Sequence, residues 1–172
     1  MTADGDSCPA WIRAMHPLDP CGPAADPVTA RPARTTPATS SEADRMQLVP
    51  HNPSDGVYPA TGYVHAMEVR GAQRLLFMSG TMGLDPGGTP GATLDEQLDL
   101  VWSNIRTILA AAGMTVDHIV RLTSYLRDAS YAEANAAARV AALGGRAVPT
   151  TVIVAETLVG EWLVEIEVIA AG

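Results

Sequence analysis

The chain has 172 residues, which is enough for one domain of ordinary size with a buried core. Its formal net charge of -8 at pH 7 argues against nucleic acid as a partner, because a nucleic-acid surface needs an excess of positive charge. All eleven residues counted as Lys+Arg are arginines, so a mechanism with a lysine Schiff base is excluded.

Residues 1–50 differ in composition from the rest of the chain. They hold eight of the 13 prolines and show little hydrophobic periodicity, which predicts a disordered tail followed by one domain over residues 51–172. Both cysteines, Cys8 and Cys21, lie in this tail, and whether they pair stays open. The predicted domain therefore has no thiol nucleophile and no thiolate metal ligand.

No segment has the pattern of an export signal or a membrane span. The first thirty residues lack a hydrophobic run followed by small residues, and no apolar stretch approaches the length that crosses a bilayer. We therefore expect a soluble, cytoplasmic protein without a membrane partner.

Two strands are predicted early in the domain. Residues 63–69 alternate in hydrophobicity, and residues 74–79 follow after a turn at Arg70-Gly71-Ala72, which predicts an antiparallel hairpin. Residues 85–91 are rich in glycine and proline and are expected to form an exposed loop. They lack the lysine and the spacing of a phosphate-binding loop.

Two helices with a strand between them come next. Thr93 and Glu96 form a predicted capping box at the start of a helix that ends at Gly113. Residues 119–127 are predicted to form a strand. Ser130 and Glu133 predict a second capping box, opening an alanine-rich helix that runs to about residue 143.

The last two predicted strands carry the most informative pattern. Residues 150–155 are β-branched on both faces, which predicts a strand buried from both sides and paired with the last strand. Residues 162–170 alternate, so that Glu165 and Glu167 lie opposite an apolar stripe. This acidic face is either solvated or covered by another subunit that encloses one carboxylate for chemistry.

The order of elements predicts an α+β fold, with a sheet of five to six strands and two helices on one face. A single layer of helices leaves the opposite sheet face bare. Because that face mixes apolar and ionisable residues, we expect it to mediate self-association.

Several separated segments resemble the RidA (YjgF/YER057c/UK114) family over residues 57–171. They are FMSG at 77–80, AAAGM at 110–114, YLRD at 125–128, Asn135, PTTV at 149–152 and VEIEVIA at 164–170. The resemblance implies a chorismate-mutase-like fold, a homotrimer with clefts between subunits, and hydrolysis of reactive enamines and imines to ammonia and a 2-oxo acid. It implies no metal and no organic cofactor.

The resemblance also assigns a site. Glu165 matches the family's catalytic glutamate, with a role as general acid/base, and the positions implied to bind substrate are Tyr63, Ser79, Gly80, Asn135, Thr150, Thr151 and Trp162. One position departs from the family pattern. Pro149 stands where active deaminases have an arginine that grips the substrate carboxylate, and Arg146 is offset by three residues.

The sequence leaves three functions open. The first is a deaminase-like enzyme that acts on an imine, enamine or related labile small molecule other than the usual 2-imino acids. The second is a trimeric small-molecule binding or regulatory protein without turnover, because fold resemblance alone does not establish function. The third is a tailoring enzyme of specialised-metabolite biosynthesis.

Overall fold

The computed structural model describes residues 45–172. The predicted tail, apart from its last six residues, and the question of Cys8 and Cys21 lie outside the described residues. Within them, the first strand already begins at Gln47, inside the stretch assigned to the tail. Sequence reasoning missed this strand because Pro50 interrupts its pattern.

The described strands form two sheets. A two-stranded ribbon pairs β1 (Gln47–His51) with β2 (Ala66–Arg70) in antiparallel fashion. A four-stranded sheet has the order β3-β6-β4-β5. Its strands are β3 (Leu75–Met82), β4 (Ile119–Leu126), β5 (Thr150–Val154) and β6 (Val164–Ala171).

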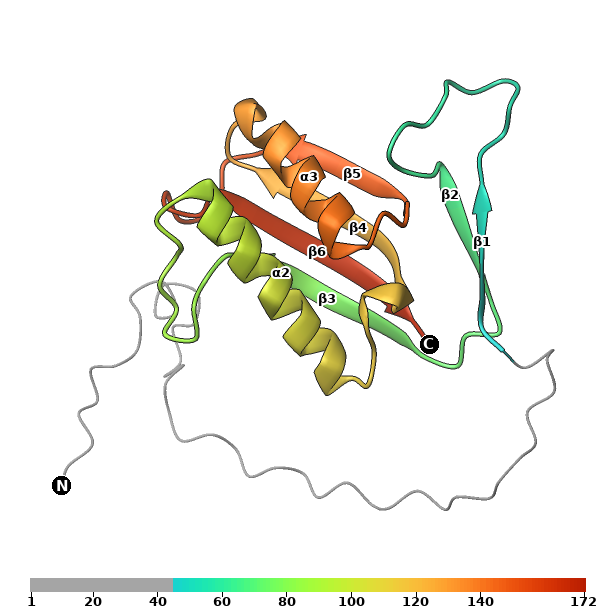
Figure 1. The fold of residues 1–172 in the computed structure, drawn as a ribbon, viewed down its shortest axis with the longest axis horizontal. Coiled ribbons are helices and arrows are strands. Elements are labelled where there is room, and N and C mark those ends of the chain that lie inside the picture. The colour runs from blue at the N-terminus through green and yellow to red at the C-terminus, as the bar shows by residue number, and fades with distance from the viewer. Residues whose placement is uncertain (1–44) are drawn as a thin grey trace, which may run out of the picture. The chain divides into compact units, whose positions relative to one another are not determined.

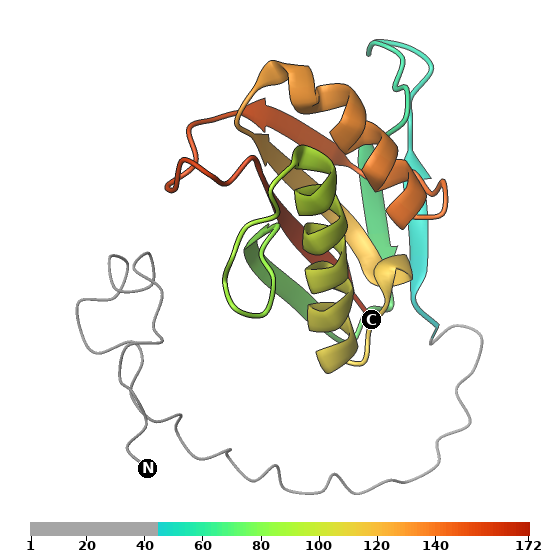
Figure 2. The ribbon, with the colours of Figure 1, turned by 60° about the vertical axis from the view of Figure 1, so that its left-hand side comes forward.

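Two α-helices cover one face of the four-stranded sheet. They are α2 (Leu94–Ala111) and α3 (Ala132–Ala142), and both lie on the same side of the strands (Figures 1 and 2). Short 3-10 turns, η2 (Val116–His118) and η3 (Ala129–Tyr131), flank β4. The predicted α+β fold with two helices on one sheet face is confirmed, and we call the uncovered side the open face.

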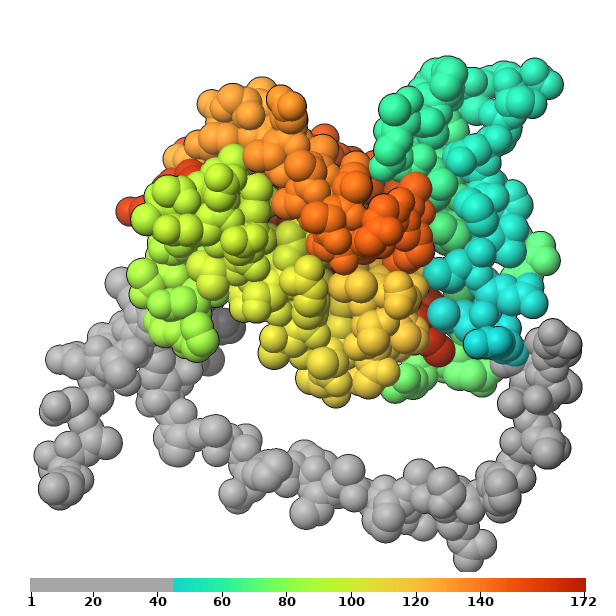
Figure 3. All heavy atoms as spheres, viewed as in Figure 1, coloured from blue at the N-terminus to red at the C-terminus, as the bar shows by residue number. Residues whose placement is uncertain are grey.

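The core lies between the helices and the central strand β6. Val164, Ile166, Val168 and Ala170 of β6 are buried beneath α2 residues such as Val101 and Ile105. Figure 3 shows that atoms of the two helices and their flanking loops cover most of this side of the sheet. Burial of so much apolar surface on one face leaves the alternate residues of β6 on the other.

The two predicted capping boxes have different outcomes. At α2 the Thr93 hydroxyl accepts from the Glu96 amide, and the Glu96 carboxylate accepts from the Thr93 amide. The box predicted at Ser130 is wrong. Asp128 caps η3 instead, because its Oδ1 atom accepts from both the amide and the hydroxyl of Ser130.

Two predicted strand pairings are also wrong. The segment 63–69 does not form a hairpin with 74–79, since β2 pairs with β1 and β3 pairs with β6. The segment 150–155 is not the neighbour of β6 either, because β4 lies between them and α3 connects β4 to a parallel β5. β5 is an edge strand, and four of its five residues are exposed.

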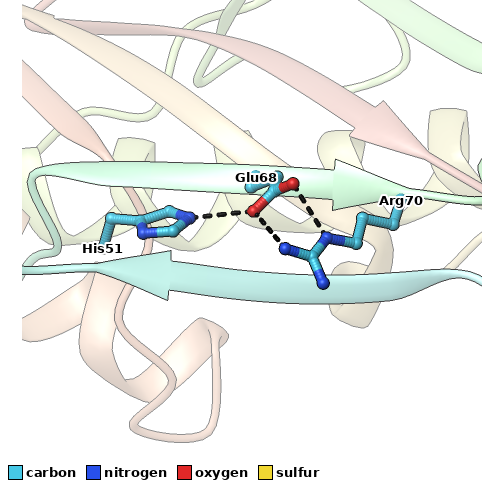
Figure 4. A network of polar contacts seen from close by, with 3 residues as sticks. All are labelled: His51, Glu68 and Arg70. Atoms are coloured by element: carbon cyan, nitrogen blue, oxygen red, sulfur yellow. Dashed lines mark hydrogen bonds and ion pairs between the residues drawn. The ribbon is translucent and has the colours of Figure 1, made fainter.

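A polar network ties the two strands of the ribbon together (Figure 4). Glu68 accepts hydrogen bonds from Arg70 at 2.8 and 2.9 Å, and His51 Nε2 lies 3.0 Å from the same carboxylate. The hydrogen bonds from Arg70 and then from His51 lower the pKa of Glu68 to about 2. The carboxylate is therefore charged at every pH above that value, which keeps this tie across β1 and β2 intact.

A buried glutamine, Gln97 on α2, holds two loops against the helix. Its side-chain amide donates to the carbonyls of Gly91 and Glu161, both at 2.8 Å, and its oxygen accepts from the Leu163 amide at 2.9 Å. Gln97 is 2% exposed, so water cannot replace these partners. The glutamine thereby sets the entry of the chain into β6.

We expect Gln97→Ala to lower the free energy of unfolding by about 2–4 kcal/mol, because it leaves buried backbone groups unpaired and opens a cavity. Chemical denaturation measures this change. Gln73→Ala is the matched control, since Gln73 is exposed and should change the value by less than about 0.5 kcal/mol. Equal effects of the two substitutions would refute the role assigned to Gln97.

Candidate functional site

Glu165 and Gly80 meet on the open face at an irregularity of β3. The pairing of β3 with β6 shifts register between Met78 and Thr81, and Ser79 and Gly80 lie at this bulge. The Glu165 carboxylate packs directly against Gly80, where any Cβ atom would overlap Oε1. The structure therefore brings together three of the predicted site residues, and Gly80 is required by this close approach.

The surroundings of Glu165 favour its protonated form. Burial, and then the neighbouring charge of Glu167, raise the pKa of Glu165. No described residue donates a hydrogen bond to it. Glu167 is in a different position, because the Tyr125 hydroxyl donates to its Oε2 atom at 2.8 Å. Of the two carboxylates, Glu165 is thus the one free to exchange a proton.

A second group of predicted residues lines a cavity of about 470 Å³ at the N-terminal ends of β4 and β5. We call it the aromatic pocket. Tyr58, Tyr63 and His65 come from the segment before β2, and Thr150 and Thr151 come from β5. Its other lining residues are Val64, Ala66, Met67, Val120, Arg121, Pro149 and Ile169.

His65 organises the aromatic wall of this pocket. Its ring makes edge-on contacts with Tyr58 and Tyr63, with centroid distances of 5.0 and 5.6 Å. His65 Nε2 lies 2.7 Å from the Tyr58 carbonyl. Because a carbonyl only accepts, the proton of the neutral imidazole must be on Nε2. Burial, and then the Tyr58 hydroxyl, raise the pKa of Tyr63, so this phenol stays protonated at neutral pH.

Arg121 is a pocket residue that the sequence analysis missed. It lies on the open face of β4, opposite Ile169 of β6, and lines both the aromatic pocket and a neighbouring hollow of about 270 Å³ that contains Phe77 and Glu167. The alternation of Arg121, Thr123 and Tyr125 within the predicted strand was the available signal. It shows which residues share a face, but not that this face opens into a pocket.

One chain does not unite the two groups of site residues. Thr151 is aligned with Thr123, which is aligned with Glu167, so β5 and β6 are two strand spacings apart, about 10 Å. Glu165 is a further two residues along β6. Neither Glu165 nor Gly80 lines the aromatic pocket among the described residues.

Two further predicted positions are buried. Asn135 on α3 is 1% exposed and its Oδ1 atom has no described hydrogen-bond partner, while Trp162 is 2% exposed in the loop before β6. Neither lines the aromatic pocket. Their assignment to substrate binding stays a prediction.

The structure places Pro149 in the wall of the aromatic pocket, whereas Arg146 is held elsewhere. Arg146 donates to the carbonyls of Ile119 and Val116 at 2.9 and 2.6 Å. It is thereby fixed to the turn before β4 as a structural residue. Among residues 45–172, no guanidinium on the β5 side of the pocket takes the place of Pro149.

Over residues 45–172, no three His, Cys, Asp or Glu side chains gather in a way that could hold a metal ion. In the same part of the chain, no helix is long and apolar enough to cross a membrane.

Comparison with known proteins defines the class. The Ribonuc_L-PSP family, described as Endoribonuclease L-PSP, matches residues 54–172. The chain is 43% identical over 54 residues to the RutC family protein YjgH of Escherichia coli, a stretch that covers 31% of this chain and 41% of that relative. The chain therefore belongs to the RidA/YjgF family, as its sequence motifs predicted.

Solved structures agree with this assignment. YyfB of Yersinia pestis, from the conserved Rid protein family, has a TM-score of 0.63 and 27% identity, covering 74% of this chain and 98% of that one. RidA of the Antarctic bacterium Psychrobacter sp. PAMC 21119 has a TM-score of 0.56 and 23% identity, covering 70% and 97%. This second likeness concerns the fold alone.

We expect Glu165 to titrate above the ordinary glutamate value of about 4.3. Glu167→Gln should lower the pKa of Glu165 by removing the second cause of its shift, and Gly80→Ala should lower it by displacing the carboxylate toward water. Titration of the side-chain carboxyl carbon by NMR measures these values. An ordinary pKa in the unsubstituted protein would show that Glu165 is solvated.

Proposed function

We propose that this protein hydrolyses a reactive imine or enamine of a small molecule, with Glu165 as general acid/base. The observation that carries the proposal is the half-buried carboxylate of Glu165 against Gly80, where burial raises the pKa of the carboxyl and so makes the carboxylate a stronger proton acceptor. Membership of the RidA/YjgF family supports the reaction class. Neither a metal nor an organic cofactor is invoked.

In the proposed reaction, water adds to the imine carbon while the Glu165 carboxylate accepts a proton from that water. The π electrons of the C=N bond move to nitrogen, which takes up this proton from Glu165. The hydroxyl of the resulting carbinolamine then gives its proton to the amino nitrogen, the C–N bond breaks, ammonia leaves, and the remaining oxygen forms the carbonyl. The sum is imine plus water giving carbonyl plus ammonia, without oxidation or reduction.

A homotrimer would complete the site. Glu165 with Gly80, and the aromatic pocket with Thr151, are separate in one chain, so a neighbouring subunit is needed to place one group over the other. The open face has the character of such an interface, since Leu75 is 58% and Phe77 70% exposed. Both side chains lie on the uncovered side of β3, because the alternate residue Met78 is in the core.

We expect Phe77→Asp to dissociate this assembly, because it would place a charge in an apolar interface. Size-exclusion chromatography with light scattering should give the mass of three chains for the unsubstituted protein and of one chain for the variant. Val140→Asp is the control, since Val140 is 47% exposed on α3, away from the open face. A monomeric unsubstituted protein would contradict the proposed assembly.

A binding protein without turnover is the second candidate, and Pro149 favours it. With proline in this part of the wall, β5 offers no cation and no amide N–H to fix a substrate at that position. In this alternative, Glu165 only hydrogen-bonds a ligand. A tailoring step in specialised-metabolite biosynthesis would use the same acid/base chemistry on another substrate.

Glu165→Gln separates the enzyme from the binding protein. For the enzyme we expect a loss of roughly 10²–10⁴-fold in the rate of ammonia release from an imine generated by a dehydratase. Glu133→Gln, an exposed carboxylate of α3 away from the open face, is the control and should retain the full rate. An unchanged rate in Glu165→Gln would refute the catalytic role of Glu165, and no turnover of this imine by the unsubstituted protein would favour the binding protein.

The same variant should fold normally. A raised carboxyl pKa means that the folded state binds this proton more tightly than the unfolded state. The charged carboxylate therefore destabilises the folded protein at pH values above the pKa of Glu165 in the folded state. This destabilisation disappears as the pH falls below the pKa of the same group in the unfolded chain. Glu165→Gln should be at least as stable as the unsubstituted protein at pH 7, which thermal unfolding can check.

A further inference from the structure

We infer that Arg121 binds an anionic group, a carboxylate, of the small molecule that occupies the aromatic pocket. The inference deepens the proposed function, because it takes this pocket to be part of the substrate site. It also changes the expected class of substrate. Pro149 by itself suggested a substrate without a carboxylate, whereas Arg121 supplies a cation from the neighbouring strand.

The strand register places Arg121 beside Pro149. Leu122 is aligned with Thr150, and the Leu122 amide donates to the Pro149 carbonyl at 3.1 Å. The residues just before this pair, Arg121 on β4 and Pro149 on β5, therefore run side by side. Both line the aromatic pocket together with Tyr63.

The guanidinium of Arg121 is uncommitted. It forms no hydrogen bond or ion pair with any described residue. The acidic residue nearest to it in register on the open face, Glu167, accepts a hydrogen bond from the Tyr125 hydroxyl instead.

Three other arginines of residues 45–172 are already bound within the chain. Arg146 is fixed by two backbone carbonyls, Arg139 donates to the Gly62 carbonyl at 3.1 Å, and Arg70 pairs with Glu68. Each of these guanidinium groups already has an acceptor within the chain. Arg121 is thus the cation whose donors are available to a ligand in the pocket.

The chemistry of the pocket fits a carboxylate. A guanidinium offers two parallel N–H donors that match the two oxygens of a carboxylate, and such charge-assisted hydrogen bonds are strong. The other lining residues add the Thr151 hydroxyl and the rings of Tyr58 and Tyr63, which suit a small planar molecule. Among the described lining residues no carboxylate opposes an anion.

Pyruvate and methyl pyruvate are the probes that test this inference, because they differ in the charge of one group and little in shape. Binding is followed by amide shifts of Tyr63 and Thr151 in NMR titrations of the full chain. We expect the unsubstituted protein to bind pyruvate at least roughly tenfold more tightly than the ester. Arg121→Gln should remove this preference, and Arg121→Lys should keep part of it.

Two controls make the result specific. Arg106→Gln removes an exposed arginine of α2, on the helix-covered side of the sheet, and should leave the preference for pyruvate unchanged. Glu133→Gln, which removes an exposed carboxylate of α3, should also retain it. A preference that survives Arg121→Gln, equal affinities for the two probes, or no binding of pyruvate would overturn the inference. Loss of turnover in Glu165→Gln is a separate outcome that tests the proposed function alone.

Discussion

The pairing of β6 on both sides is the constraint on which the rest of the structure depends. β3 and β4 bond to its two edges, so the strand cannot shift by one residue without exposing its apolar stripe to water. Because Val164, Ile166 and Val168 must face the helices, Glu165 and Glu167 must face the other way. The position of the carboxylates is thus a consequence of core packing.

The chemical properties of Glu165 and Glu167 on the open face then depend on the residues that contact each carboxylate. The bulge of β3 brings Gly80 against Glu165 and shields it from water, whereas Tyr125 on β4 binds Glu167. Two residues with the same sequence pattern thereby acquire different surroundings, and burial raises the pKa of Glu165. Arg121, one strand away, adds a cation between the acidic residues and the aromatic pocket.

Predictions from the sequence succeeded where neighbouring residues alone decide the structure. They failed where a residue or strand has more than one possible hydrogen-bonding partner. The capping box at Thr93 needs only residues three positions apart, and it is present. Ser130 offers the same spacing, but Asp128 competes successfully for its amide and hydroxyl. The pairing of β2 and the neighbours of β5 depend on segments far away in the chain, which hydrophobic periodicity does not specify.

By itself the sequence determined the order of elements from β2 onward, the two helices, the face on which Glu165 lies, and the family, because hydrophobic alternation and short motifs are written in consecutive residues. Only the tertiary structure decided that β5 is an exposed edge, that Gly80 touches Glu165, and that Arg121 shares a pocket with Pro149 and Tyr63. These contacts join strands distant in sequence, and their existence depends on sheet order and register, which arise from packing of the whole domain.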